Sequence, residues 1–265
     1  MANTKKNVIA IIQARMGSTR LPGKALKKIL DKTLIEWIRY RLSFCKEVDR
    51  IVLSTSESKD NDPLAKHAEE IGLDCFRGSE TDLVKRILET ARKFKADAII
   101  RVTGDCPLVD PALVDKLVKI YRDRKNLDYI TNILPPTFPD GIDIEIISTK
   151  TLERLDREVK DPLYREWITT TIMENPDKFN VLNISNEENL FHLRLTVDYP
   201  EDFELVEEIF KKLYKEGSIF GLREILELFK KEPELIKINE KWVDKNVVNN
   251  IRSNEFHNLK LDINN

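Results

Sequence analysis

The chain has 265 residues, and its 44 basic and 46 acidic side chains nearly cancel, which argues against a general nucleic-acid or membrane-surface binder. An anionic ligand would therefore have to meet a local cluster of cations. The three cysteines, Cys45, Cys75 and Cys106, lie far apart without C-x-x-C spacing, so neither a disulfide framework nor a zinc site is indicated. The apolar run near the N-terminus is too short for a signal peptide or a membrane span, which predicts a cytoplasmic protein.

Strand and helix patterns alternate in the first half of the chain. Runs rich in β-branched residues predict strands at residues 8–12, 50–55 and 98–103. Segments whose apolar residues mostly recur three or four positions apart predict helices at residues 34–44, 63–72 and 82–94. Because the first two strands are almost entirely apolar, they favour a parallel sheet that is covered on both faces. This half therefore predicts an α/β fold of the β-α-β-α-β-α-β type.

The alternation is looser after residue 105. We expect helices at residues 111–124, 149–159, 163–174 and 199–217, and strands at residues 127–133, 142–148, 179–185 and 191–197. No linker is long enough to force a second domain, but the composition becomes rich in Lys, Glu and Asn from residue 222 onward. We therefore predict an α/β domain over residues 1–221 and a helical or partly ordered extension over residues 222–265.

Residues 14–24, ARMGSTRLPGK, follow the first predicted strand and combine three cations with two glycines. Loops at the carboxyl edge of a parallel sheet are where open α/β proteins bind ligands. Small residues let backbone amides approach an oxyanion, and Arg15, Arg20 and Lys24 supply charge-assisted donors, so the loop suits a polyphosphate. Neither a Walker loop nor a Rossmann glycine motif is present. The alternative is a surface turn whose cations are solvated.

A second motif, RVTGDCPLVDP at residues 101–111, places a Gly-Asp-x-Pro turn at the end of an apolar strand. In a parallel sheet, the Asp105 carboxylate would face the same edge as the cationic loop. Taken alone, an aspartate in this position is more often a helix cap or a turn former. The two motifs together indicate an anion site with a carboxylate beside it.

The sequence IIQARMGSTRLPGKAL, residues 11–26, resembles the N-terminal signature of sugar-activating cytidylyltransferases. These are the CMP-Kdo and CMP-acylneuraminate synthetases and, above all, their SpsF-like spore-coat polysaccharide relatives. The resemblance implies a three-layer α/β/α fold with a mostly parallel sheet, of the Rossmann-like, GT-A-like nucleotide-diphospho-sugar transferase type. It also implies that the loop wraps the triphosphate of CTP through Ala14, Arg15, Gly17, Ser18, Arg20 and Lys24.

The resemblance further implies a Mg²⁺ site built from two aspartates. Asp105 matches the aspartate of the family's Gly-Asp-x-Pro segment, and Asp198 in LRLTVDYPEDFELV matches a second one late in the chain. Mg²⁺ usually takes only one or two protein carboxylates besides substrate phosphates and waters, which fits this pair. A helix-capping role is the alternative for Asp198, because Pro200 follows it. The three histidines show no spacing typical of a softer metal.

Two further segments resemble parts of the family that lie near the nucleotide. CFRGSETDLVKR, residues 75–86, implies that Arg77 and Gly78 contact the cytidine or its phosphates. LSTSES, residues 53–58, implies that Thr55 and Ser56 contact the base. For the first segment, a strand-to-helix turn with Ser79 as the helix cap is the alternative, and both interpretations can hold together.

Two other segments resemble parts that lie near the acceptor. FPDGIDIEIIS, residues 138–148, implies that Asp143 and Glu145 accept hydrogen bonds from a sugar, although a solvated strand face would show the same alternation. DPLYREWITTTI, residues 161–172, implies an acceptor contact for Arg165. Trp167 stands here where a histidine is common in the family, so this segment departs from the pattern.

These features predict a Mg²⁺-dependent cytidylyltransferase that moves CMP from CTP to a sugar acid or a phosphorylated small molecule, with Arg15, Lys24 and Asp105 as catalytic residues. Such an enzyme would serve the synthesis of surface polysaccharide or glycoconjugate precursors. Because many members of the family form dimers, the resemblance implies a homodimer. We expect neither nucleic acid nor a membrane as a partner. One alternative is a metal-dependent glycosyltransferase, whose D-x-D motif would be the DND of residues 60–62. The other is a nucleotide-binding module without turnover.

Overall fold

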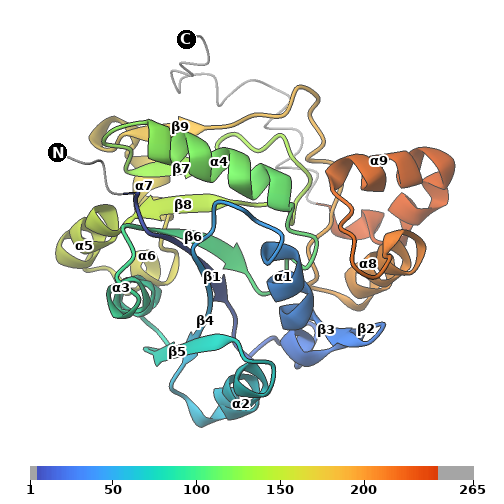
Figure 1. Ribbon diagram of the computed structural model, residues 1–265, viewed down its shortest axis with the longest axis horizontal. Coiled ribbons are helices and arrows are strands. Elements are labelled where there is room, and N and C mark those ends of the chain that lie inside the picture. Colours follow the sequence, from blue (N-terminus) through green and yellow to red (C-terminus); the bar gives the residue numbers. More distant parts are fainter. Residues whose placement is uncertain (1–4, 244–265) are drawn as a thin grey trace.

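The computed structural model describes residues 5–243. A seven-stranded sheet forms the centre of the protein (Figure 1). The strands lie in the order β5-β4-β1-β6-β8-β7-β9. Every neighbouring pair is parallel except the two pairs made by β8, so β8 alone runs against the others. The bounds are β1 (Val8–Gln13), β4 (Arg50–Ser56), β5 (Asp74–Gly78), β6 (Ala98–Thr103), β7 (Tyr129–Thr131), β8 (Glu145–Ser148) and β9 (Val181–Asn183). The predicted mostly parallel sheet is confirmed.

Helices cover both faces of this sheet, as the continuous apolar strands predict. In β1, Val8, Ala10 and Ile12 face one apolar cluster, whereas Ile9 and Ile11 face another. The first cluster is closed by α1 (Leu34–Leu42), α2 (Asp62–Glu70) and α4 (Pro111–Asp123). The second is closed by α3 (Leu83–Lys93), α5 (Thr149–Glu158) and α7 (Thr170–Glu174). The three-layer α/β/α architecture is therefore confirmed.

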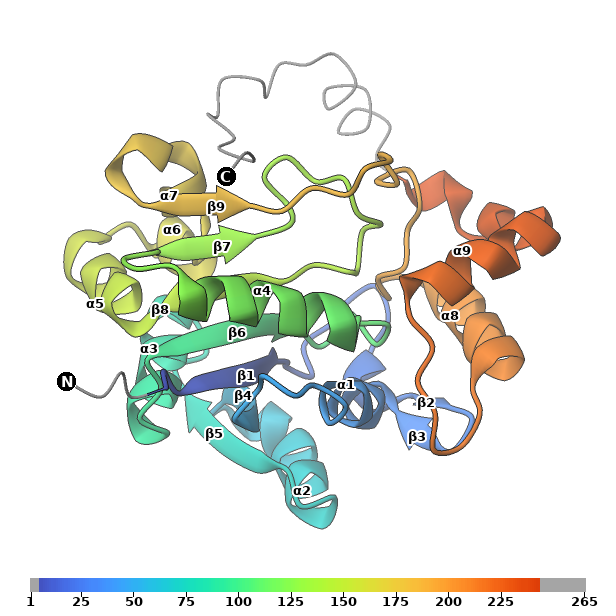
Figure 2. The same cartoon turned by 45° about the horizontal axis from the view of Figure 1, so that its top comes forward.

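A third apolar cluster lies where α8 (Pro200–Leu213) and α9 (Leu222–Lys231) pack beside α1 (Figure 2). The ring of Trp37 on α1 lies 4.2 Å from the ring of Phe210 on α8, and both side chains are fully buried. Truncating such a buried aromatic residue to alanine costs about 3–5 kcal/mol. This contact therefore fixes the position of α8 relative to the sheet.

The region after residue 221 contributes to the same cluster. Ile225, Leu228 and Phe229 of α9 are buried against α8 and α1. This region contains α9 and two short 3-10 helices, η4 (Pro233–Ile238) and η5 (Glu240–Trp242). The domain boundary after residue 221 stays a prediction, and the part of the predicted extension at residues 244–265 lies outside the described residues.

The remaining elements are short. A small hairpin, β2 (Lys28–Ile29) with β3 (Lys32–Thr33), precedes α1 and was not expected from the sequence. The other elements are η1 (Lys24–Leu26), η2 (Lys59–Asn61), η3 (Pro176–Lys178) and α6 (Pro162–Glu166). None of the helices within residues 5–243 is both long and apolar enough to cross a membrane.

Three expected elements differ from those observed. The helix expected at residues 163–174 is split into α6 and α7, because Trp167 leaves the helical region and the β-branched run that follows is a poor helix former. The helix expected to reach residue 217 ends at Leu213, and Gly217 with φ 75° belongs to the next turn. Residues 191–197 form no strand, but make one isolated bridge between Asp140 and Arg194.

Candidate active site

The loop after β1 carries the cationic motif, and it is anchored by η2, which lies in the connection between β4 and α2. The backbone N–H of Met16 donates to Oδ1 of Asn61 at 2.8 Å, and Asn61 is buried. Gly23 has φ 67°, a conformation that a residue with a side chain would adopt only with strain. The turn at Gly23 starts η1 at Lys24 and thereby sets the direction in which the lysine leaves the loop.

Gly104 brings the loop after β6 against the loop after β1. Its N–H donates to the carbonyl of Gln13 at 2.8 Å. A Cβ atom at this position would lie 2.6 Å from Cβ of Ala14, which is closer than two non-bonded carbon atoms can approach. Glycine is therefore required here by the close packing of two loops. As a result, the next residue, Asp105, faces the cationic loop.

The segment that precedes α8 returns to the same place. The N–H of Val197 donates to the carbonyl of Asp105 at 2.8 Å. Gly141, with φ 100°, lets the segment pass, because a Cβ atom there would lie 2.3 Å from the backbone nitrogen of Thr196. These contacts place Asp198 beside Asp105, although the two residues come from distant parts of the sequence.

Lys24 joins the two aspartates. Its Nζ lies 2.8 Å from Oδ2 of Asp105, 2.8 Å from Oδ1 of Asp198 and 2.9 Å from the carbonyl of Val197. Burial favours the neutral form of each group, but the attraction within the cluster outweighs it. Lys24 and its hydrogen bond therefore hold the pKa of Asp105 below its usual value, and the two carboxylates raise the pKa of Lys24.

Two arginines extend this cluster. Arg20, which the sequence predicts as a phosphate ligand, lies 2.9 Å from Oδ1 of Asp198. Arg194 was not predicted, and it forms ion pairs with Asp140 at 2.7 Å, with Asp198 at 3.1 Å and with Asp202 at 3.0 Å. The alternating pattern LRLTVD could have predicted this residue, because it places Arg194 on the same side of the segment as Asp198.

Arg15 lies at the rim of the site and points away from this cluster. Its guanidinium is half exposed and pairs with Glu166 at 3.3 Å and with Glu80 at 3.6 Å. The structure thus brings together Lys24 with Asp105, but it directs Arg15 toward the acids of α6 and of the loop before α3. Because these acids are themselves exposed, the pairs are weak and an incoming anion can compete for the arginine.

Arg77 and Gly78 lie on β5, beside the end of β4. Arg77 donates to the carbonyls of Ser56 and Ser58 at 3.1 and 2.9 Å and pairs with Asp62 at 2.7 Å. A Cβ atom at Gly78 would lie 2.8 Å from the ring of Phe76. Both residues therefore shape the sheet edge, and their predicted nucleotide contacts stay predictions.

Three other predicted nucleotide contacts lie on or next to the loop. A Cβ atom at Gly17 would meet nothing within 4 Å, so its backbone is open to a ligand. Oγ of Ser18 accepts a long hydrogen bond from the N–H of Leu21 at 3.4 Å. Thr55 is buried in β4, and its Oγ1 has no hydrogen-bond partner within residues 5–243. Their roles toward the nucleotide stay predictions.

Asp143 and Glu145 differ in their surroundings. Glu145 is buried and is bound by Arg101 and by the hydroxyl of Tyr129 at 2.5 Å, so both of its oxygens are already occupied. Asp143 is partly accessible. Its burial, with the nearby carboxylates of Asp140 and Glu145 adding to the effect, raises its pKa well above the usual value. Of the two predicted acceptor ligands, only Asp143 is partly accessible, and the acceptor contacts of both stay predictions.

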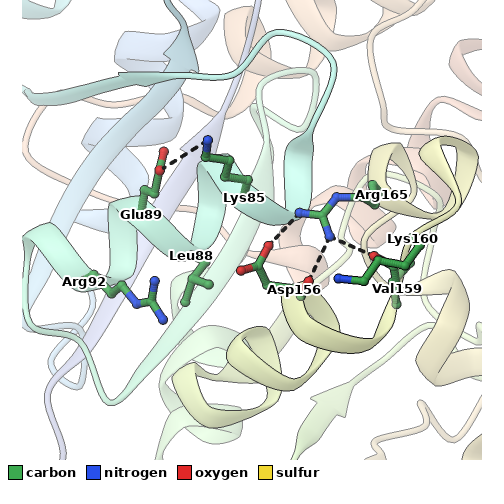
Figure 3. Close-up of a pocket in the computed structure, with 8 residues that line it drawn as sticks. All are labelled: Lys85, Leu88, Glu89, Arg92, Asp156, Val159, Lys160 and Arg165. Carbon is green, nitrogen blue, oxygen red and sulfur yellow. Dashed lines mark hydrogen bonds and ion pairs between the residues drawn. The ribbon is translucent and has the colours of Figure 1, made fainter.

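Arg165 lies in a groove of about 450 Å³ between α3, α5 and α6 (Figure 3). It pairs with Asp156 at 2.6 Å and with Asp82 at 2.7 Å, and it donates to the carbonyls of Asp156 and Val159. All of its nitrogen atoms are engaged in holding α6 to the neighbouring helices. The structure therefore does not bring Arg165 together with Lys24, and its predicted acceptor contact stays a prediction.

The two predicted metal ligands fit a cation that takes most of its ligands from a substrate. Within residues 5–243, no group of three or more His, Cys, Asp or Glu side chains is arranged to hold a metal ion. Oxygens of Asp105 and Asp198 nevertheless converge on one positive charge, the ammonium of Lys24. Two convergent carboxylates are what Mg²⁺ typically receives from a protein when a nucleotide supplies the other ligands.

A family model described as cytidylyltransferase matches residues 9–235, and the chain belongs to this family. It is 33% identical over 238 residues to the uncharacterized protein MJ1063 of Methanocaldococcus jannaschii, covering 88% of this chain and 94% of that one. It is 31% identical over 236 residues to the spore coat polysaccharide biosynthesis protein SpsF of Bacillus subtilis, covering 86% and 96%. A solved cytidylyltransferase from Leptospira borgpetersenii superposes with a TM-score of 0.83 at 36% identity, covering 87% and 97%.

Family membership confirms the predicted resemblance and defines the protein as a nucleotidyltransferase that uses CTP. It favours nucleotidyl transfer over both alternatives drawn from the sequence. The DND motif of the glycosyltransferase alternative also has other roles in the structure. Asn61 anchors the cationic loop, and Asp62 pairs with Arg77.

Proposed function

We propose that this cytidylyltransferase transfers CMP from CTP to a sugar acid or a phosphorylated small molecule, releases pyrophosphate and depends on Mg²⁺. The observation that supports the proposal most directly is the contact of the Lys24 ammonium with both Asp105 and Asp198 at 2.8 Å. It unites the cationic loop with two distant carboxylates in one cluster at the carboxyl edge of the sheet. A nucleoside triphosphate with a divalent cation matches both halves of that cluster, because its phosphates suit the loop cations and its metal ion suits the carboxylates.

Asp105 and Asp198 would hold the Mg²⁺. When bound there, the ion would supply positive charge that offsets the negative charge of the phosphates. Arg194 supports this arrangement, because it holds one oxygen of Asp198 at 3.1 Å. The other oxygen of Asp198 would remain free for a cation once Lys24 and Arg20 have turned to the phosphates.

The loop cations would act on the phosphates. An acceptor oxygen, which gives its proton to solvent if it is a hydroxyl, forms a bond to the α-phosphorus. The bond from that phosphorus to the oxygen that bridges it to the β-phosphorus breaks, and its electron pair leaves with pyrophosphate. Lys24 and Arg20 already point into the cluster and would stabilise the charge that builds on the leaving group. Arg15 would join them by leaving its exposed partners, Glu80 and Glu166.

The acceptor would bind beside Asp143, whose partly accessible carboxyl group could exchange hydrogen bonds with sugar hydroxyls. A role in the synthesis of surface polysaccharide or glycoconjugate precursors is supported by the likeness to the Bacillus subtilis protein, whose name places it in spore coat polysaccharide biosynthesis. A cytoplasmic location and a homodimer are part of the proposal. Light scattering on the full chain would test the dimer.

A pyrophosphate-release screen tests the activity. Each of the four common nucleoside triphosphates is incubated with Mg²⁺ against sugar acids, sugar 1-phosphates and polyol phosphates. We expect release with CTP and with one of these acceptor classes. Consumption of a nucleotide sugar without pyrophosphate release would instead support a glycosyltransferase. Binding of CTP without product for any acceptor would contradict the proposed turnover.

A further inference from the structure

The C-terminal part of the described chain meets the start of α8, two residues beyond Asp198. Asn239 is almost completely buried, with 2% of its surface exposed. Its Nδ2 donates to Oδ1 of Asp202 at 2.8 Å and to the carbonyl of Arg194 at 3.0 Å. A single side chain from the region after α9 thus contacts two residues that surround Asp198.

Asp202 is the centre of this arrangement. It is fully buried, and one of its oxygens accepts hydrogen bonds from the N–H groups of Asp198 and Tyr199, both at 2.9 Å. Its other oxygen accepts from Nε of Arg194 at 3.0 Å and from Asn239. A buried carboxylate is stable only when its oxygens are satisfied by donors. Each donor therefore helps to fix the backbone of Asp198.

Trp242 makes a second contact with the same turn. Its ring stacks on the ring of Tyr199 with 3.6 Å between centroids and 1° between planes. Its Nε1 donates to Glu201 at 2.9 Å, and Lys241 pairs with the same carboxylate at 2.6 Å. Residues 239–242 thus hold the first turn of α8 through a buried amide, an aromatic stack and an exposed ion pair.

We infer that Asn239 and Trp242 are positioning residues for the cytidylyl transfer, and that they act by fixing Asp198 in the orientation in which it binds the divalent cation. The inference rests on the proposed metal role of Asp198. Neither residue contacts Lys24 or Asp105 in its hydrogen bonds, so each acts through Asp202, Arg194 or Tyr199. Groups that orient metal ligands in this way typically change metal affinity by about 10–100-fold when they are removed.

The test measures divalent cation binding separately from turnover. Asn239→Leu keeps the size of the side chain but removes the donor. With CTP present, Mn²⁺ binding followed by electron paramagnetic resonance should weaken by at least about tenfold. The Mg²⁺ concentration that gives half-maximal pyrophosphate release should rise by a similar factor, while the KM for CTP at saturating Mg²⁺ changes much less.

Asn7→Leu is the matched control for a purely structural effect. Nδ2 of Asn7 also donates to two carbonyls, those of Phe94 and Lys95 at 3.1 and 2.8 Å. Asn7 precedes β1, however, and therefore lies at the amino edge of the sheet, opposite the site. This variant should lower the melting temperature without changing Mn²⁺ binding.

Trp242 provides a second pair of variants, in case Asn239→Leu does not fold. Trp242→Leu removes the stack on Tyr199 and should also weaken Mn²⁺ binding. Trp242→Phe keeps an aromatic ring there and should restore most of that binding. If both Asn239→Leu and Trp242→Leu lower stability yet bind Mn²⁺ as the wild type does, the inference is overturned.

Asp198→Asn separates this result from a failure of the proposed function. If Asp198→Asn weakens Mn²⁺ binding and the two positioning variants do not, only the positioning role is wrong. If Asp198→Asn also leaves Mn²⁺ binding unchanged, the metal role of Asp198 is wrong, and the positioning role is overturned with it.

Discussion

The ammonium of Lys24 and the carboxylate of Asp105 lie 2.8 Å apart, although the two residues are separated by 81 positions in the sequence. The contact links the loop after β1 to the loop after β6, and Asp198 completes it from a third segment. Lys24 therefore has two kinds of anionic partner during the proposed reaction, the carboxylates of the protein and the phosphates of the nucleotide. A cation that occupies the carboxylates must displace the lysine from between them.

This relationship predicts that Lys24 suppresses metal binding in the absence of nucleotide. Lys24→Met removes a positive charge from between two carboxylates, so that only Arg20 and Arg194, both beside Asp198, still offset their repulsion. Unit charges about 4 Å apart interact by about 4 kcal/mol at an effective dielectric of 20, so even a fraction of that energy is measurable. Mn²⁺ binding without CTP, measured by electron paramagnetic resonance, should tighten by at least about tenfold.

Lys28→Met is the control, because Lys28 is exposed on β2 and carries the same charge. It should leave Mn²⁺ binding unchanged. The prediction would fail if Lys24→Met and the wild type bound Mn²⁺ equally well without CTP. Such a result would mean that the ammonium of Lys24 does not compete with a divalent cation for the two carboxylates.

A second prediction concerns Asp105 itself. Asp105→Asn keeps the shape of the side chain but removes the charge, and it should slow pyrophosphate release by at least about a hundredfold, the scale of losing one preorganised electrostatic group. Steady-state rates at saturating CTP and Mg²⁺ would measure the effect, and thermal unfolding would be recorded in parallel. Near-normal activity with an unchanged melting temperature would count against a metal role for Asp105.

The meeting of Lys24 with Asp105 could be predicted from the sequence, because each follows a buried strand and parallel strands end at one edge of a sheet. The direction of Arg15 could not be predicted in this way. Its partners, Glu80 and Glu166, come from segments whose proximity depends on how α3 and α6 pack. Local sequence patterns carry no information about such packing, and the same is true of the contact between Asn239 and Asp202.

The strand expected at residues 191–197 was wrong for a physical reason. Apolar residues alternate there as they do in a strand, and Leu193, Leu195 and Val197 are indeed buried in one cluster. Their backbone groups, however, bond to the loops at Asp140 and Asp105 and not to a neighbouring strand. The alternation of apolar and polar residues thus predicted the burial correctly, but it could not predict whether a hydrogen-bonded partner strand exists.

The pKa of Asp140 predicts a pH dependence of stability. Burial raises this pKa to about 6, Arg194 opposes the increase and the neighbouring carboxylates add to it. Between the usual value near 4 and this value, the folded protein holds a proton that the unfolded chain has lost. Stability contributed by Asp140 therefore falls as the pH rises through this interval.

Asp140→Asn cannot titrate at this position. The free energy of unfolding of the variant, relative to the wild type, should therefore rise between pH 4 and pH 7 by about 1–3 kcal/mol, as one pH unit of pKa shift corresponds to about 1.4 kcal/mol. Urea unfolding of the metal-free protein across this range would measure the difference. A constant difference would show that Asp140 titrates with an ordinary pKa in the folded protein.

The last prediction compares two glycines of the site. Gly104→Ala would place a Cβ atom 2.6 Å from that of Ala14, so one of the two loops must move. Overpacking of this kind typically costs about 1–3 kcal/mol, and the movement would also separate Asp105 from Lys24. We therefore expect Gly104→Ala to lower both the melting temperature and the rate of pyrophosphate release.

Gly17→Ala should behave differently, because a Cβ atom there meets nothing within 4 Å and the folded protein accommodates it without strain. Its melting temperature should equal that of the wild type. If the backbone of Gly17 lies against the triphosphate, as the resemblance implies, the added methyl group should raise the KM for CTP by about tenfold, the effect of losing about 1.4 kcal/mol of binding. An unchanged KM would place the triphosphate elsewhere on the loop. A loss of stability would show that Gly17 serves the fold and not the nucleotide.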